Sequence, residues 1–215
     1  MLKNYAREKN LSYVIGIDEV GRGPFAGPVV TAGVVLPPDF ESELIVDSKL
    51  ICKSKKKMQV AYDLIMDNAL YVHCNAQSAK VIDEIGIEDA IWQSMDICIF
   101  EVSIQMALKE PKYMLDHILV DGNRYGGKYN SFPVTTVVKG DNTYLSIAAA
   151  AIVAKYRRDA YMDKIHELHP HYGFDGNKGY YSSKHRDGLL EHGRTRYHRK
   201  QYVDTWEANQ EKKLQ

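Results

Sequence analysis

Residues 13–36 read YVIGIDEVGRGPFAGPVVTAGVVL, and this stretch decides the fold class. Two runs rich in β-branched residues, 13–20 and 28–36, flank a short segment rich in glycine and proline. β-Branched side chains pack well on a pleated surface, whereas glycine and proline mark turns. Because the link between the two runs is short, we expect an antiparallel hairpin.

Helical and extended patterns alternate through the rest of the chain. Helical patterns, the first of them capped by Ser54, cover residues 55–69, 78 to about 109 with a break near Gly86, and 142 to about 166. Strand patterns cover residues 70–74, 118–120 and 133–138. This order predicts an α/β or α+β layered fold with a mixed sheet. The last fifty residues lack a strand pattern, so we expect a small C-terminal helical appendage there.

Length and composition are those of an ordinary globular protein. The chain has 215 residues, of which 45% are hydrophobic, and 28 Lys and Arg balance 28 Asp and Glu. We expect a core over residues 1–165 and the appendage over 166–215, which could both belong to one domain. A net charge of zero excludes a uniformly basic nucleic-acid-binding chain, but it leaves room for a local basic patch.

The sequence carries no pattern of secretion or membrane insertion. Its three cysteines fit no disulfide framework, and the N-terminal residues MLKNYAREKN are polar. The longest apolar run, residues 145–154, is far shorter than the roughly 20 residues that a membrane helix needs. We therefore predict a cytoplasmic protein with no membrane partner, and a monomer by default.

Positive charge concentrates near the C-terminus. Residues 178–200 contain seven Lys and Arg against two acidic residues, with Tyr180, Tyr181 and Tyr197 among them. Basic residues interleaved with aromatic ones suit phosphate contact combined with stacking on sugars or bases. A solvated helical face is the alternative interpretation of the same pattern.

Four acidic residues occupy unusual positions. Asp18 and Glu19 lie in an apolar strand, Asp121 follows the apolar segment HILV, and Asp141 precedes a strongly predicted helix. Each has an ordinary explanation: an arginine partner for one of the first pair, a turn at Asp121, and helix N-capping by Asp141. If the four converge, they form an all-oxygen site for hard cations such as Mg²⁺ or Mn²⁺.

Several longer strings make the chain recognisable. It resembles the ribonuclease HII family over nearly its whole length, and the matching strings occur in the family order. They are GIDEVGRGPFAGPVV at 16–30, DSK at 47–49, LVDGN at 119–123, GDNTYLSIAAAAIVAKYRRD at 140–159, HYGFDGNKGYYSSKH at 171–185 and HR at 198–199.

The resemblance implies a ribonuclease H-like fold, with a mixed five-stranded sheet flanked by helices. It also implies that Asp18, Glu19, Asp121 and Asp141 are catalytic residues that bind two Mg²⁺ or Mn²⁺ ions. The expected activity is hydrolysis of RNA in RNA–DNA hybrids and cleavage on the 5′ side of single ribonucleotides in duplex DNA. The products would carry 5′-phosphate and 3′-hydroxyl ends, and the cellular roles would be ribonucleotide removal and RNA primer processing.

The resemblance also implies how the substrate is recognised. Backbone groups of three consecutive residues would contact the 2′-hydroxyl, a tyrosine would pack on the deoxyribose beyond the junction, and two further residues would contact phosphates. The three consecutive residues are Gly21, Arg22 and Gly23, and the tyrosine is Tyr180. The two residues expected to contact phosphates are Lys49 and Ser146.

The chain departs from the family pattern at a few positions. Ala151 stands where serine is usual, Tyr181 where glycine is usual, and Arg194 and Arg196 lie where proline is common. These changes affect the expected substrate affinity and the strictness with which the RNA-to-DNA junction is recognised. We expect the two arginines to strengthen phosphate binding. A binding module without catalysis and another two-metal nuclease or strand transferase on this fold are the alternative functions.

Overall fold

The computed structural model describes residues 1–129 and 131–214, and its central element is a five-stranded mixed sheet. In chain order the strands are β1 (Val14–Val20), β2 (Val29–Val35), β3 (Tyr71–Gln77), β4 (His117–Asp121) and β5 (Val134–Val137). Their order across the sheet is β3-β2-β1-β4-β5. β1 pairs with β2 antiparallel, whereas β1 with β4 and β4 with β5 are parallel. The predicted hairpin and mixed sheet are therefore confirmed.

The long helices lie where the sequence predicts them. Ser54 caps α3 by accepting a hydrogen bond from the Lys57 N–H, and Gly86 separates α4 from α5. The helices are α1 (Tyr5–Lys9), α2 (Ser48–Ile51), α3 (Lys55–Asn68), α4 (Ala79–Ile85), α5 (Ile87–Lys109), α6 (Leu145–Leu168), α7 (Phe174–Asn177), α8 (Ser183–His192) and α9 (Lys200–Leu214). None of the described helices is both long and apolar enough to span a membrane.

One short helix lies outside the predicted elements, and one predicted helix starts later than expected. The short helix α2 lies just before Ser54, and Asp47 caps it by accepting from the Lys49 N–H. The helix expected from residue 142 begins at Leu145, because residues Gly140–Asn142 form a separate 3₁₀ turn. Asp141 lies in that turn, so it does not serve as the N-cap of α6.

Packing divides the chain into two compact units. The first contains residues 1–20, 30–75 and 91–157, and the second contains residues 21–29, 76–90 and 158–215. The expected boundary at residue 165 stays a prediction. The second unit has its own core, in which Phe174 and Tyr172 stack beside Met162 and Leu189.

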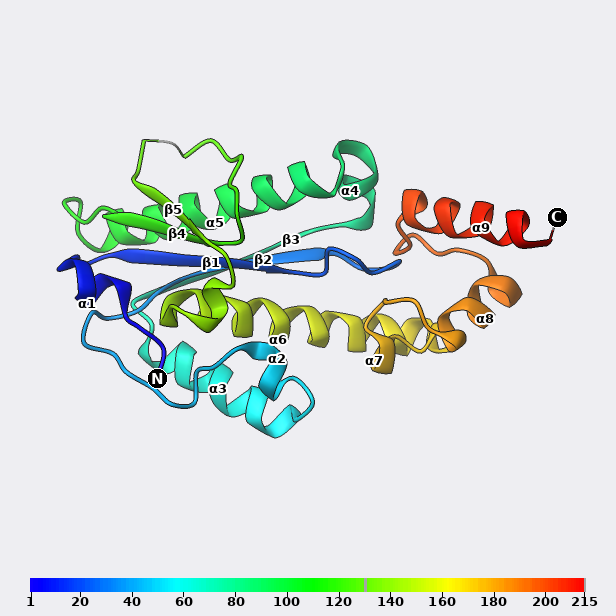
Figure 1. Cartoon of the computed structure of the whole chain (residues 1–215), viewed down its shortest axis with the longest axis horizontal. Helices are drawn as coiled ribbons and strands as arrows, with labels where there is room; N and C mark the ends of the chain where they lie inside the picture. Colours follow the sequence, from blue (N-terminus) through cyan, green and yellow to red (C-terminus); the bar gives the residue numbers. More distant parts are fainter. Residues whose placement is uncertain (130, 215) are drawn as a thin grey trace. The chain divides into compact units, whose positions relative to one another are not determined.

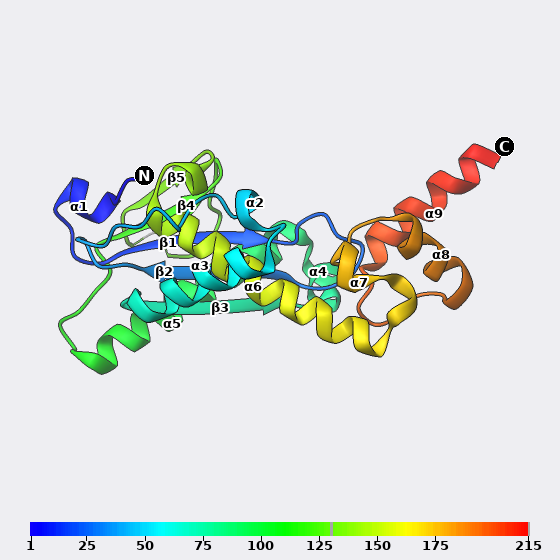
Figure 2. The same cartoon turned by 90° about the horizontal axis from the view of Figure 1, so that it is seen from below.

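In the first unit, helices cover both faces of the sheet (Figure 1 and Figure 2). On one face, Ala32 and Val34 of β2 share a buried cluster with residues of α3 and α6. On the other face, the thiol of Cys98 in α5 donates to the main-chain oxygen of Thr31. The sheet is thus buried on both sides.

A single glycine controls how closely α6 approaches β1. A Cβ at Gly16 would lie 2.3 Å from the carbonyl carbon of Ser146 and 2.5 Å from the nitrogen of Ile147. Both are main-chain atoms, so the helix could not yield without moving as a whole. The missing side chain of Gly16 therefore brings the start of α6 directly against the strand that carries Asp18.

We expect Gly16→Ala to destabilise the protein by about 2 kcal/mol or more, because the added methyl group meets backbone rather than a flexible side chain. Thermal melting should show a decrease of about 4–8 °C. Gly176→Ala is the matched control, since no atom lies within 4 Å of a Cβ at that position. Equal melting temperatures for the two variants would contradict this account of the packing.

Candidate active site

The acidic residues gather at one edge of the sheet. Asp18 lies near the carboxyl end of β1, and Asp121 is the last residue of β4. Because β1 and β4 are parallel neighbours, their carboxyl ends meet at the same edge. Asp141 follows in the 3₁₀ turn, and the N–H of its neighbour Gly140 donates to the Asp121 carboxylate at 2.6 Å.

Asp18 is buried, and its pKa is strongly shifted. It is 7% exposed, and its Oδ1 accepts from the Glu19 N–H at 2.7 Å. Burial, followed by repulsion from Glu19 and Asp121, raises the pKa of Asp18 well above its usual range. Within the described part of the chain it forms no ion pair, so the arginine-partner interpretation does not apply to Asp18.

Glu19 follows Asp18 without any bulge. The β1–β2 register is regular from Ile15↔Val35 to Val20↔Val30, so the pleat directs the Asp18 and Glu19 side chains to opposite faces. Glu19 is half-buried and still contributes to the raised pKa of Asp18. The two carboxylates therefore interact electrostatically from opposite faces near the end of the strand.

Burial also raises the pKa of Asp121, and the hydrogen bond from the Gly140 N–H partly opposes that effect. Asp141 is almost fully buried and interacts with a lysine. The Nζ of Lys49 lies 2.9 Å from Asp141 Oδ2, and this hydrogen bond raises the pKa of Lys49. One ammonium group thus faces several carboxylates, which leaves the edge negatively charged.

Asp47 belongs to this edge, although the sequence did not single it out as a site residue. Its carboxylate lies 3.8 Å from the Lys49 Nζ and accepts from the Asn142 side chain at 3.2 Å. The DSK string at 47–49 was the available signal, but a capping aspartate at the start of a helix is common. Ser146, predicted to contact phosphate, is buried at the start of α6 next to Gly16.

The donor chemistry of this edge fits a hard divalent cation. All of its acidic groups are carboxylates, and oxygen ligands are those that Mg²⁺ and Mn²⁺ prefer. Among the described residues, no three His, Cys, Asp or Glu side chains already stand in metal-binding geometry. A cation bound here would therefore draw the carboxylates together and offset their mutual repulsion.

The second unit contains the residues expected to recognise the ribose and the following deoxyribose. Gly21 has φ +97°, and a Cβ there would lie 2.3 Å from the Arg158 Nε. A Cβ at Gly23 would lie 3.8 Å from a ring carbon of Tyr180, so the structure brings these two predicted residues together. Tyr180 is 44% exposed, which argues against its role as mere core packing.

Main-chain hydrogen bonds fix Tyr180 beside the glycine-rich loop, residues 21–28 between β1 and β2. The Phe25 and Ala26 N–H groups both donate to the Gly179 oxygen, at 2.8 and 3.2 Å. Gly179 has φ +84°, and a Cβ there would lie 2.2 Å from the Ala26 oxygen. The residue before Tyr180 must therefore be glycine for the two segments to approach so closely.

The basic stretch is largely engaged within the protein. Arg194 forms ion pairs with Asp204 and Glu207, and Arg196 hydrogen-bonds the Tyr197 hydroxyl. Arg199 is completely buried. The expected strengthening of phosphate binding by Arg194 would therefore first require it to leave two carboxylates.

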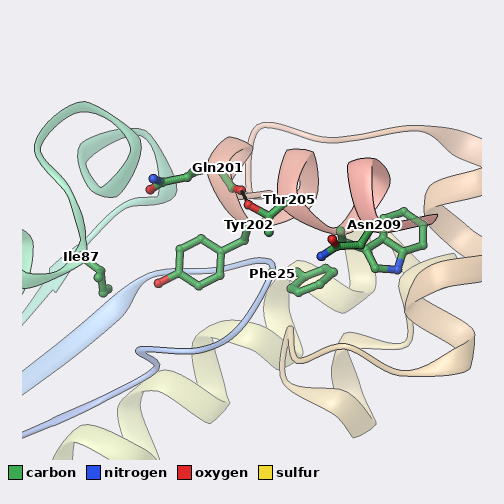
Figure 3. Close-up of a pocket in the computed structure, with 7 residues that line it drawn as sticks. Phe25, Ile87, Gln201, Tyr202, Thr205 and Asn209 are labelled. Atoms are coloured by element: carbon green, nitrogen blue, oxygen red, sulfur yellow. Dashed lines mark hydrogen bonds between the residues drawn. The ribbon is translucent and has the colours of Figure 1, made fainter. Parts of the chain in front are cut away.

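A groove of about 470 Å³ lies beside the glycine-rich loop (Figure 3). Phe25 from the loop and Tyr202 and Trp206 from α9 line it. The Tyr202 hydroxyl also donates to the Arg22 oxygen at 2.8 Å, so α9 supports the loop directly. No sequence pattern predicts this contact.

Removing the buried charge of Asp18 should stabilise the fold. The pKa of Asp18 is higher in the folded protein than in the unfolded chain. The free energy of unfolding therefore decreases as the pH rises from the unfolded-state pKa to the folded-state pKa. We expect Asp18→Asn to melt above wild type at neutral pH, with the difference shrinking toward about pH 4. Asp63→Asn, on the exposed side of α3, is the control. A variant that melts below wild type at neutral pH would refute the interpretation.

Comparison with known proteins places the chain in a family. The family model described as Ribonuclease HII matches residues 15–206. Ribonuclease HII of Bacteroides thetaiotaomicron is 44% identical over 184 residues, which are 86% of each chain. Ribonuclease HII of Bacillus mycoides is 40% identical over 201 residues, covering 94% of this chain and 73% of that one.

Solved structures show the same fold at lower identity. Ribonuclease H2 from Pyrococcus horikoshii is 21% identical with a TM-score of 0.68, covering 88% of this chain and 93% of that one. Bst-RNase HIII in complex with Mn²⁺ is 15% identical with a TM-score of 0.71, covering 95% and 71%. The predicted ribonuclease H-like fold is thereby confirmed. With its motifs and its relatives in agreement, this chain belongs to the ribonuclease HII family and is an endonuclease of the ribonuclease H type.

Proposed function

We propose that the protein hydrolyses the RNA strand of RNA–DNA hybrids and cuts on the 5′ side of single ribonucleotides embedded in duplex DNA. The observation that carries the proposal is the buried Asp18, whose carboxylate is crowded by other carboxylates at the ends of β1 and β4. Membership of the ribonuclease HII family supports the same reaction class. The products would carry 5′-phosphate and 3′-hydroxyl ends.

Asp18, Asp121 and Asp141 are residues that would hold divalent cations, Mg²⁺ or Mn²⁺. Glu19 would join them around the end of β1, since the pleat directs its side chain to the other face of the strand. Such cations, when bound, lower the pKa of an attacking water and neutralise charge on the departing 3′-oxygen. The carboxylates themselves supply ligand oxygens, so the reaction requires no side-chain nucleophile. The Mn²⁺ complex of Bst-RNase HIII is consistent with this assignment.

Lys49 is suited to a second role at the same edge. Its ammonium group contacts the buried Asp141, yet three quarters of its side chain remains exposed. An exposed lysine beside the carboxylates can contact a substrate phosphate as a point charge. Ser146 would also contact a substrate phosphate. Because Ser146 is buried, the phosphate backbone of the nucleic acid would have to approach the start of α6 closely.

Ribose recognition is assigned to the Gly21–Gly23 backbone, and recognition of the following deoxyribose to Tyr180. The 2′-hydroxyl is the group that distinguishes RNA from DNA, and backbone without a Cβ can approach it closely. Gly23 and Tyr180 lie next to each other, so one short stretch of substrate could contact both. Such an enzyme would remove embedded ribonucleotides and process RNA primers in the cytoplasm, acting as a monomer.

A nucleic-acid-binding module that has lost catalysis is the alternative function. Clustered carboxylates repel phosphates, so a pure binder would gain nothing from an acidic edge that is also costly to bury. We therefore favour the nuclease.

A duplex containing one ribonucleotide tests the proposal. With Mg²⁺ or Mn²⁺ we expect a single cut on its 5′ side, and none with EDTA or in the all-DNA duplex. Asp121→Asn should lower the rate at least about a hundredfold while hybrid binding survives, because a cation ligand is worth several kcal/mol. Asp63→Asn should cut normally. Absence of cutting by the folded wild-type protein on this duplex and on a long hybrid would favour the binding module.

Substituting Tyr180 should affect junction recognition rather than folding. We expect Tyr180→Ala to lower kcat/KM on the single-ribonucleotide duplex about tenfold, the value of one stacking contact, with a smaller loss on a long hybrid. Tyr181→Ala is a matched control, because Tyr181 is adjacent and similarly exposed. The melting temperature should change by less than about 3 °C, the effect of 1 kcal/mol. A large loss of stability with equal losses on both substrates would favour a packing role.

A further inference from the structure

Two arginines of the second unit, Arg158 and Arg199, are buried with 0% exposure. Within the described part of the chain neither forms an ion pair, and all six of their side-chain hydrogen bonds go to main-chain oxygens. Buried charges are normally paired, because leaving water is costly. Burial and the neighbouring Arg158 lower the pKa of Arg199 to about 10. Carbonyl oxygens therefore hold both charges in place, and the guanidinium groups of Arg158 and Arg199 also lie over the rings of Tyr180 and Tyr202.

Arg199 holds the glycine-rich loop at three points. Its Nη2 donates to the Gly21 oxygen at 2.6 Å, its Nη1 to the Arg22 oxygen at 2.8 Å, and its Nε to the Gly27 oxygen at 3.0 Å. The planar guanidinium can donate in three directions at once, which a lysine ammonium cannot do at the same positions. The side chain thus forms a fork inside the loop.

This fork determines where the following N–H groups point. The peptide bonds are trans, so each carbonyl points opposite to the N–H of the next residue. Because the Gly21 and Arg22 oxygens face Arg199, the Arg22 and Gly23 N–H groups point away from it. The hydrogen bond from the guanidinium also polarises the carbonyl. The N–H of the next residue, which belongs to the same peptide group, is therefore a stronger donor.

Other contacts fix the loop from its second side. Arg158 donates to the oxygens of Pro28 and Ala26, at 2.9 and 3.3 Å, and its Nε lies only 2.3 Å from where a Cβ of Gly21 would be. The Arg199 N–H donates to the Phe25 oxygen at 2.7 Å. The loop is therefore held in one conformation before substrate arrives.

We propose that Arg199 is a specificity-determining positioning residue, whose guanidinium directs the Arg22 and Gly23 N–H groups toward the 2′-hydroxyl of the substrate ribose. The inference rests on the proposed assignment of Gly21–Gly23 to ribose recognition. Arg199 itself does not touch the substrate, because it is buried beneath the loop. A hydroxyl oxygen accepts from the two N–H groups, whereas a deoxyribose offers no acceptor at that position.

The test compares Arg199→Lys, which keeps the charge but loses the fork, with wild type. We expect kcat/KM on the single-ribonucleotide duplex to decrease about ten- to a hundredfold, the value of one to two hydrogen bonds to charged or polarised groups. Binding of an all-DNA duplex should stay within about twofold. Leu189→Ala, in the core of the same unit, controls for lost stability, and all assays are run below the melting temperature of each variant.

A milder pair of variants covers the case in which Arg199→Lys does not fold. Tyr202→Phe removes a hydroxyl that donates to the Arg22 oxygen at 2.8 Å. Tyr172→Phe removes one that donates to the Gly193 oxygen at the same distance, away from the loop. Tyr202→Phe should lower ribonucleotide cleavage about fivefold, the value of one hydrogen bond of about 1 kcal/mol, and Tyr172→Phe less than twofold.

Two results separate this inference from the proposed function. If wild type cuts at the ribonucleotide and folded Arg199→Lys cuts equally well, the positioning role is overturned and the proposed function stands. If Arg199→Lys does not fold, equal cleavage by Tyr202→Phe and Tyr172→Phe overturns the positioning role in the same way. If wild type does not cut at the ribonucleotide at all, the result contradicts both the positioning role of Arg199 and the proposed cleavage at single ribonucleotides.

Discussion

Mutual repulsion among carboxylates at the ends of β1 and β4 is the constraint on which the site depends. Asp18 is buried beside other acids, and burial alone already disfavours its ionised form. The fold maintains this costly arrangement through close packing: Gly16 brings α6 against β1, and the Gly140 N–H holds Asp121. In the proposed function a divalent cation would offset the repulsion, so the same feature that costs stability would create affinity for metal.

In the proposed function, discrimination between sugars would depend on a second energetically unfavourable feature, the two buried arginines of the other unit. Among the described residues, Arg158 and Arg199 have no acidic ion-pair partner, and carbonyl oxygens of the glycine-rich loop and its neighbours accept their hydrogen bonds. An acidic partner would compete with those carbonyls for the guanidinium donors. Two guanidinium groups that bind carbonyl oxygens and lie over the Tyr180 and Tyr202 rings therefore fit the proposed loop, whose N–H groups would face outward.

The sequence predicted the regular elements because their signals are local. β-Branched runs marked β1 and β2, Ser54 marked the start of α3, and Gly86 marked the break between α4 and α5. The comparisons confirm the family resemblance. The assignment of the four carboxylates as site residues came from that resemblance and stays a prediction, because their individual patterns also fit a turn or a cap. The contacts of Asp47, Arg158 and Arg199 were not predictable, since their partners lie far along the chain or are main-chain oxygens, which any residue provides.

Thermal melting with and without Mn²⁺, in wild type and in Asp18→Asn, tests the central claim most directly. A cation that binds only the folded carboxylate edge stabilises by about 2.7 kcal/mol at a hundredfold excess over its Kd, which corresponds to about 5–10 °C. The account predicts that increase for wild type and little or none for Asp18→Asn, which should start from a higher melting temperature without metal. An equal increase in both proteins, or none in either, would contradict it.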